Sequence, residues 1–275
     1  MKELLVETLA HFYRELKYVS RTPSWIVVFA LLPYVMAAIS YLMGLAASSL
    51  AGELAFALFE ETTGARDPLV YFLVGYGVMM PSFLVISVAS QCIGAELYRG
   101  TLEHLFSSPI NRVLYAVVDP LPWVGVALAA LCASYAPILV YWKGLSFALD
   151  FLQALLVALV GLLPLVGIGL MSAVLTIKTR EYWVASNFLQ GVVTLFSGFA
   201  YPLSVLPSWM RVVSLFLPTS HAVELIREIL EEGASLLPNW RLPVLLLMAP
   251  AYVSAGALAF KLVVERGERS GELYR

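Results

Sequence analysis

The chain has 275 residues, of which 60% are hydrophobic and only 13% are charged, and its mean hydropathy is +0.84. Soluble domains carry charge at about a quarter of their positions, so this composition excludes an ordinary soluble protein and predicts an all-α membrane protein. The formal net charge of −2 provides no basic surface for nucleic acid. Cys92 and Cys132 lie in apolar segments without metal-ligand spacing and are expected to be free thiols.

The first 23 residues predict an amphipathic helix that lies in the membrane interface. Its apolar residues recur at helical spacing between charged ones: Leu5, Leu9, Phe12, Tyr13 and Leu16. Pro23 then allows the chain to turn into the bilayer. The helix is either a simple anchor or a lever that moves with the first span. No cleavable signal peptide is expected, because the first apolar run is too long for one.

Six segments are apolar enough to cross the membrane, which requires about 20 residues each. They lie within residues 24–47, 69–92, 113–142, 151–177, 182–200 and 242–264. Six crossings define one transmembrane domain over residues 24–264, followed by a cytoplasmic tail at 265–275. Of the 17 lysines and arginines, twelve fall on the side of the termini and five on the other. The positive-inside rule therefore predicts that both termini lie in the cytoplasm, and we expect a multi-pass protein of the plasma membrane.

A charged stretch at residues 94–109 separates the second and third spans. Its charged residues stand at helical spacing: Glu96, Arg99, Glu103 and His104. A connection that only reverses the chain needs a few polar residues, so this stretch indicates a surface that a partner outside the bilayer grips. In the third span, Asp119-Pro120 predicts a kink near the start. Asp119 is either a site for a proton or cation, or a structural carboxylate with a partner.

Two spans carry polar stripes. The stripe of the fifth span advances in steps of three and four residues, so its members share one helix face: Trp183, Asn187, Gln190, Thr194, Ser197 and Tyr201. A second stripe lies on the second span: Phe83, Ser87, Ser90, Gln91 and Gly94. Such faces point at other helices or at a cavity. They indicate either helix–helix contacts or the lining of a transport path, and both hold if the stripes meet at a dimer interface.

The segment 201–241, outside the membrane on the far side from the termini, begins with an unusual stretch. Residues 201–209 are too apolar for a solvated loop and are interrupted by Pro202 and Pro207. We expect this stretch to re-enter the outer leaflet, where protein must cover its irregular backbone. An amphipathic helix is predicted from Thr219 to Glu232, ending at Gly233.

The sequence offers little for covalent chemistry. It contains no GxxxxGK[ST] phosphate-binding loop and no metal-ligand cluster. Ser220, His221 and Glu224 come closest to a catalytic set, but their helical positions do not form a nucleophile relay. We therefore expect a transport protein that is not an enzyme and binds no cofactor or metal itself.

Two motifs resemble those of ABC-2 type transporter permeases. The first reads Glu96…Arg99-Gly100-Thr101-Leu102-Glu103-His104-Leu105…Ser108-Pro109. The second comprises Gly198, Tyr201-Pro202-Leu203-Ser204, Leu206-Pro207, Trp209, Pro218-Thr219, His221-Ala222 and Arg227. The six spans and the N-terminal interface helix are similar as well, so the resemblance covers nearly the whole chain.

The resemblance implies a permease subunit of an ATP-binding cassette exporter, working as a homodimer or heterodimer with cytoplasmic ATPase subunits that bind ATP and Mg. Residues 1–23 would be the connecting helix and residues 94–109 the coupling helix. The ATPase would contact Glu96, Arg99, Gly100, Thr101, Leu102, Glu103 and His104. The translocation path would be lined by Phe83, Ser87, Ser90, Gln91, Asn187, Gln190, Thr194 and Ser197. The re-entrant motif would include Tyr201, Pro202 and Pro207.

The expected cargo is lipophilic or amphipathic (a drug, lipid or glycan-lipid), because the proposed path contains no lysine or arginine. Two alternatives stay open. A secondary transporter driven by an ion gradient requires paired ionisable residues near the bilayer midplane, and only Asp119 is available, near one end. A non-transporting scaffold would explain the charged stretch but not the re-entrant segment.

Overall fold

The computed structural model describes residues 2–21, 23–51, 54–65, 67–102, 104, 111–143, 148–233 and 235–270. These residues form a bundle of helices and contain no strand. The helices, in chain order, are α1 (Lys2–Ser20), α2 (Ser24–Ala51), α3 (Leu54–Thr63), α4 (Pro68–Arg99), α6 (Arg112–Val118), α7 (Leu121–Lys143), α8 (Ala148–Thr179), α9 (Tyr182–Ser197), the 3₁₀-helix η2 (Leu203–Val205), α10 (Ser208–Leu215), α11 (Pro218–Glu232) and α12 (Arg241–Ser270).

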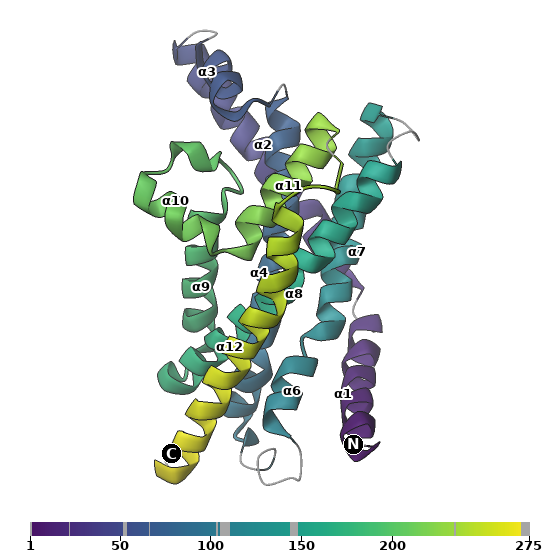
Figure 1. Ribbon diagram of the computed structural model, residues 1–275, viewed down its shortest axis with the longest axis vertical. Coiled ribbons are helices and arrows are strands. Elements are labelled where there is room, and N and C mark those ends of the chain that lie inside the picture. Colours follow the sequence, from purple (N-terminus) through teal and green to yellow (C-terminus); the bar gives the residue numbers. More distant parts are fainter. Residues whose placement is uncertain are drawn as a thin grey trace.

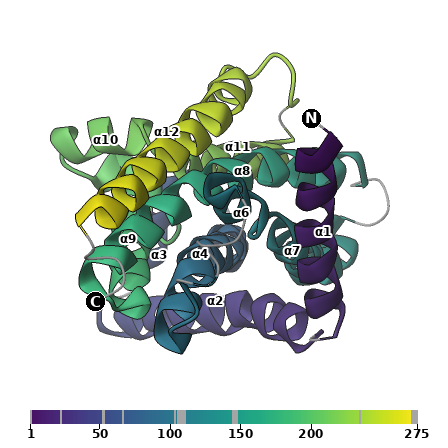
Figure 2. The same ribbon diagram turned by 90° about the horizontal axis from the view of Figure 1, so that it is seen from below.

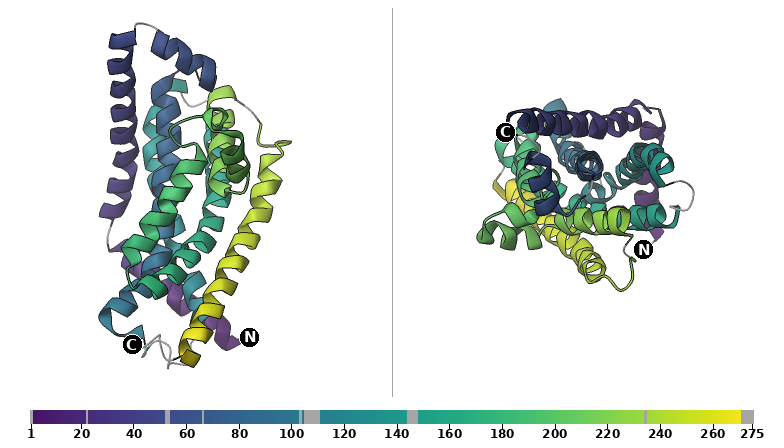
Figure 3. Two further views of the ribbon diagram at one scale, coloured as in Figure 1. Left: turned by 90° about the vertical axis from the view of Figure 1, so that its left-hand side faces the viewer. Right: turned by 90° about the horizontal axis from the view of Figure 1, so that it is seen from above.

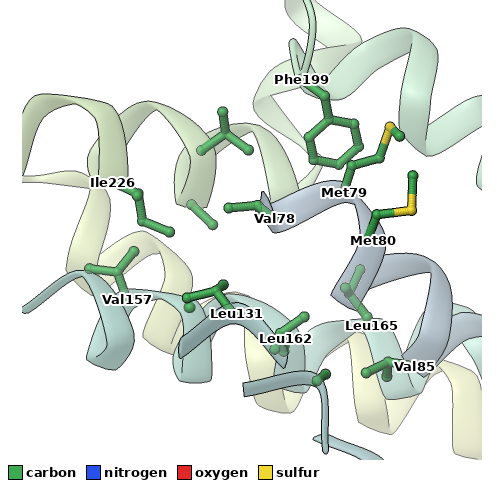
Figure 4. Close-up of a cluster of buried hydrophobic side chains, with 14 of the residues drawn as sticks. Val78, Met79, Met80, Val85, Leu131, Val157, Leu162, Leu165, Phe199 and Ile226 are labelled. Carbon is green, nitrogen blue, oxygen red and sulfur yellow. The ribbon is translucent and has the colours of Figure 1, made fainter. Parts of the chain in front are cut away.

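Helices α4 and α8 form the centre of the bundle. Helix α4 packs against α2, α7, α8 and α9, while α8 also packs against α11 and α12. Figures 2 and 3 show α4 between α2 on one side and α8 on the other, with α12 beyond α8. The main core lies between these helices; Figure 4 shows Val78, Met80 and Val85 of α4 among Leu131, Leu162, Leu165 and Ile226. The central position of α4 means that a movement of this helix affects most of the bundle.

Five helical stretches among the described residues are long and apolar enough to cross a membrane: Ser24–Ser49, Pro68–Arg99, Arg112–Pro137, Ala148–Thr179 and Arg241–Gly267. They correspond to the first, second, third, fourth and sixth predicted spans. In the first and in the last stretch, only 11% of the residues in the apolar window are buried inside the protein, as expected for helices whose apolar side chains face lipid.

The predicted fifth span is shorter than the others. Helix α9 has 16 residues and ends at Ser197, before a left-handed Gly198. At 1.5 Å per residue it is about 24 Å long, less than the roughly 30 Å of the hydrocarbon core. The chain then turns through η2 into α10, which Figure 1 shows beyond the upper end of α9. The hydrophobic pattern placed this span within residues 182–200, because hydrophobicity does not show that the helix ends before Gly198.

The two ends of the bundle differ. Figure 1 shows α1, α6 and the C-terminal ends of α4 and α12 at one end, hereafter the α1 end, and α3, α10 and α11 towards the other. The predicted kink at Asp119-Pro120 is confirmed, since α6 ends at Val118 and α7 begins at Leu121. Proline lacks a backbone N–H and crowds the preceding turn, which explains the break. The predicted helices at the N-terminus and after Pro218 are also confirmed as α1 and α11.

Candidate transport path and partner-binding site

The first half of the motif at residues 96–102 forms a tight turn at the end of α4. The helix stops at Arg99 because Gly100 adopts a left-handed conformation (φ 67°), which a glycine reaches without steric cost. The Thr101 backbone N–H donates to the Glu96 carbonyl at 3.0 Å, and the Thr101 hydroxyl donates to the Glu96 carboxylate. Glu96, Gly100 and Thr101 therefore shape the turn itself.

The turn is anchored on one side and exposed on the other. Leu102 is buried in a small core at the α1 end, together with Ile93, Tyr115, Leu170 and Phe260. In contrast, the side chain of Arg99 is 69% exposed and lies 3.9 Å from Glu96, and Tyr98 is 90% exposed. Tyr98 and Arg99 thus project from a rigid base, as residues that contact a partner should.

The sequence predicted a coupling helix over residues 94–109. Residues 94–99 belong instead to the last turns of α4, so the charged stretch begins as part of a span. Of the rest, the structure describes Gly100, Thr101, Leu102 and His104, and His104 is exposed. Glu103 and residues 105–109 lie outside the described residues.

The two predicted polar stripes meet within one chain. The Gln190 side-chain amide of α9 donates to the Ser87 hydroxyl of α4 at 2.7 Å and to the Ser186 hydroxyl at 2.8 Å. The two hydroxyls lie 3.3 Å apart, and the same amide reaches the Phe83 carbonyl at 3.4 Å. This part of both stripes is therefore a hydrogen-bonded contact between α4 and α9. Ser186 is absent from the predicted stripe, although it stands one turn before Gln190.

The other stripe residues face different neighbours. Ser90 points towards α8, where it accepts from the Ser172 hydroxyl at 2.9 Å and lies 3.2 Å from that of Thr176. Ser197 bonds Thr219 of α11, and the Thr194 hydroxyl donates to the Gln190 carbonyl of its own helix. Gln91 is half-buried and Asn187 is exposed. The stripes thus contain both helix–helix contacts and side chains that are accessible from outside the chain.

A cavity of about 590 Å³ opens at the α1 end between α1, α2, α4, α6, α7 and α9. Ser87 and Gln91 of the predicted path line it, and so do Glu96 and Arg99 of the predicted partner-binding residues. The structure therefore places Glu96 and Arg99 of the charged motif beside the same cavity as Ser87 and Gln91 of the α4 stripe. Sequence reasoning did not predict that α1 and α2 complete this cavity.

Asp119 lies at the joint between α6 and α7, where it has a partner from α1. The Arg14 guanidinium donates to its carboxylate at 2.8 Å and lies 3.1 Å from Glu15. Trp123 donates to Glu15 at 3.4 Å. Burial opposes the charge on Arg14, but Tyr115, Asp119 and Glu15 together raise its pKa above the ordinary arginine value. Of the two readings of Asp119, the structure supports a partnered structural carboxylate.

The segment between α9 and α11 is held by side chains of α11. Arg227 donates to the carbonyls of Gly198 (2.9 Å) and Phe199 (2.7 Å), and its guanidinium lies 3.6 Å from the centre of the Tyr71 ring. Burial lowers the pKa of Arg227. Gly75 is needed for this close packing, because a Cβ there would lie 1.7 Å from the Phe199 carbonyl oxygen. An irregular backbone at membrane depth requires such coverage.

Ser220 and His221 serve the same purpose. The Ser220 hydroxyl bonds the carbonyls of Ser214 and Leu217, and the His221 ring lies 2.8 Å from the Leu215 carbonyl. Glu224 pairs with Arg241 at 2.6 Å. Within the re-entrant motif, Pro202 and Pro207 precede η2 and α10, and Tyr201 bonds the Leu195 carbonyl. The three residues considered for catalysis therefore have structural partners.

Comparison with known proteins identifies the family of the chain. No curated protein matches the chain significantly. The profile of the ABC-2 type transporter family matches residues 7–230, which include most of α1, the turn after α4, both stripes and most of α11. Because the match covers most of the 275 residues, the chain belongs to the ABC-2 type transporter family, the membrane permeases of ABC transporters.

Proposed function

We propose that this protein is the permease subunit of an ABC exporter, with both termini in the cytoplasm of the cell that carries it in its plasma membrane. Residues 1–23 act as the connecting helix, residues 24–264 form a six-span domain, and 265–275 form a tail. The fifth crossing consists of α9 together with the re-entrant part of residues 201–241. The proposal is supported by the family match. It is also supported by the start of α1 and the end of α12, which lie at the same end of the bundle (Figure 1).

One observation carries the mechanism. The exposed residues Tyr98 and Arg99 and the stripe residues Ser87 and Gln91 stand on one continuous helix, α4 (Pro68–Arg99). A partner that grips the turn after α4 therefore moves the stripe directly, because a helix transmits displacement along its axis. The partner can shift the path only if it holds the turn differently in its two nucleotide states.

The partner that fits this scheme is a cytoplasmic ABC ATPase subunit, which supplies the site for ATP and Mg. In the proposed complex, Arg99 contacts an acidic group of the ATPase directly, while Glu96, Gly100, Thr101 and Leu102 keep the turn in shape. Residues 103–109 continue the coupling segment.

A second copy of the permease, or a related chain, is proposed to face α9. The outer face of this helix exposes Asn187 between Val184 and Phe188. An amide that faces lipid is unfavourable, so a polar side chain at this depth indicates a protein contact or a hydrated path. The lipophilic or amphipathic cargo then passes between α4 and α9 of the two copies.

Purification from the native membrane in mild detergent tests the proposed partnership. We expect mass spectrometry to identify an ATPase subunit with a GxxxxGK[ST] loop in the complex. The variant Arg99→Glu should retain this subunit less strongly, whereas Arg269→Glu, which changes an exposed arginine in the last turn of α12, should retain it fully. A folded permease that carries no ATPase in several detergents would contradict the proposal.

A further inference from the structure

The roles proposed for the turn after α4 and for the polar stripes do not explain why aromatic side chains line the cavity at the α1 end. Aromatic side chains form much of its wall: Tyr18 of α1, Trp25 and Phe29 of α2, Trp123 of α7 and Trp183 of α9. Figure 2 views this end of the bundle and shows α1 crossing beside α7 with α2 and α4 nearby. A volume of about 590 Å³ lies within the range of small-molecule sites.

The charges of the cavity do not balance. Among the described residues, three carboxylates line it (Glu15, Glu96 and Asp119) and two guanidinium groups (Arg14 and Arg99). Arg14 is shared between Asp119 at 2.8 Å and Glu15 at 3.1 Å, while Arg99 lies 3.9 Å from Glu96. Counted formally, carboxylates therefore exceed guanidinium groups by one in this cavity, which favours a cation over an anion.

One of the aromatic rings stands next to a carboxylate, and two others stand next to that ring. Trp123 donates its indole N–H to Glu15 at 3.4 Å. The rings of Trp25 and Tyr18 lie 6.5 Å and 6.2 Å from that of Trp123. Aromatic faces attract cations, most strongly where water is excluded. A carboxylate that contacts one indole, in a cavity lined by further aromatic rings, is suited to a cation with an apolar body and disfavours an anion.

We propose that this cavity binds a monovalent organic cation that carries an apolar or aromatic body and enters from the leaflet at the α1 end. Ser87 and Gln91 connect the cavity to the stripe on α4. The inference deepens the proposed function by naming the class of cargo, and its transport step rests on that function. Binding itself requires only the permease.

Equilibrium dialysis with radiolabelled tetraphenylphosphonium tests the binding. After subtraction of the uptake by empty nanodiscs, the permease alone, in lipid nanodiscs, should bind this cation and should bind tetraphenylborate, an anion of the same shape, at least tenfold more weakly. Glu15→Gln should weaken phosphonium binding about tenfold, because it removes one nearby charge, and Trp25→Leu should weaken it severalfold.

Two matched substitutions outside the cavity serve as controls. Glu265→Gln removes an exposed carboxylate of α12, and Trp209→Leu removes an exposed indole of α10. Both should bind phosphonium like the unaltered protein. Equal binding of the two probes, or unchanged phosphonium binding in both Glu15→Gln and Trp25→Leu, would overturn the inference. Size-exclusion profiles confirm that each variant is folded.

The natural cation can be a free lipophilic compound or a lipid whose head group carries a net positive charge. Competition by short-chain lysyl-phosphatidylglycerol in detergent would assign it to a lipid, and the absence of competition would assign it to a free compound; both outcomes agree with the stated chemistry. The outcome is also separate from that of the proposed function. If the permease binds the cation but no ATPase partner is found, this inference stands and the proposed exporter is contradicted. If an ATPase partner is found but the permease does not bind the cation, the exporter stands and this inference is overturned.

Discussion

Arg14 and Asp119 are 105 positions apart in the chain and form an ion pair at 2.8 Å that joins the N-terminal helix to the break in the third span. The carboxylate side of the pair is buried and the guanidinium side is about half exposed. Of the two readings of α1, this contact favours a helix that is mechanically connected to the bundle over one that only anchors the chain in the interface.

Arg14→Ala should therefore destabilise the protein by about 1–3 kcal/mol, less than the roughly 3–5 kcal/mol of a fully buried pair, since water reaches the arginine. Asp119→Asn should cost a similar amount. The double variant should cost clearly less than the sum of the two, because both single changes remove the same interaction. Unfolding in detergent micelles measures this cycle, and strictly additive costs would show that the pair contributes nothing.

The outer segment provides a second prediction. Arg227→Met should destabilise the protein by about 2–4 kcal/mol, because it leaves the Gly198 and Phe199 carbonyls buried without their donor. Gly75→Ala should have an effect in the same direction, since its new methyl group would collide with Phe199. Gly191→Ala is the control, because a Cβ there meets nothing within 4 Å. Thermal unfolding that ranks Gly191→Ala with Gly75→Ala would contradict this explanation.

Gln190 and Asn187 separate helix contact from transport path. Gln190→Leu should cost about 0.6 kcal/mol of stability, a typical value for a side-chain hydrogen bond between membrane helices. Asn187→Leu should leave stability unchanged and reduce transport, because this residue is exposed on the outer face of α9. Paired measurements of unfolding and of cargo uptake into inverted vesicles check both. An Asn187→Leu variant with full transport would remove this residue from the proposed path.

The turn after α4 should be sensitive at Gly100. A non-glycine residue at φ 67° costs roughly 1–2 kcal/mol, so Gly100→Ala should disfavour this turn and weaken binding of the ATPase about 5- to 30-fold while the spans remain folded. Gly191→Ala again provides the control. The affinity between purified permease and ATPase, measured in nanodiscs, decides the point; equal affinities for Gly100→Ala and the unaltered chain would mean that the shape of this turn is irrelevant to docking.

Much of this arrangement was predictable from local patterns. Hydrophobicity and length identified five of the spans, proline chemistry located the break at Asp119-Pro120, and helical spacing placed Ser87 and Gln190 on polar faces. The partners of these residues could not be predicted in the same way. Arg14 meets Asp119 and Ser90 meets Thr176 through packing between distant segments, and a stripe on one helix does not indicate which neighbour it faces.

The end of α9 illustrates a different limit. Apolar residues continue past Ser197, so the hydrophobic pattern extended the span, whereas the backbone turns at Gly198 and is held by a side chain 29 positions later, Arg227. Likewise, the cavity at the α1 end is lined by six helices, and its charges come from α1, α4 and the α6–α7 joint. Only the folded chain brings these groups together.

The central claim is that Arg99 connects an ATPase to the movement of α4. The most direct measurement is the ratio of cargo transported to ATP hydrolysed by the reconstituted complex, compared between Arg99→Glu and the control Arg269→Glu. The account predicts that Arg99→Glu loses transport per ATP hydrolysed while its spans stay folded, and that Arg269→Glu keeps the original ratio. An unchanged ratio in Arg99→Glu would contradict the assignment of this turn as the coupling site.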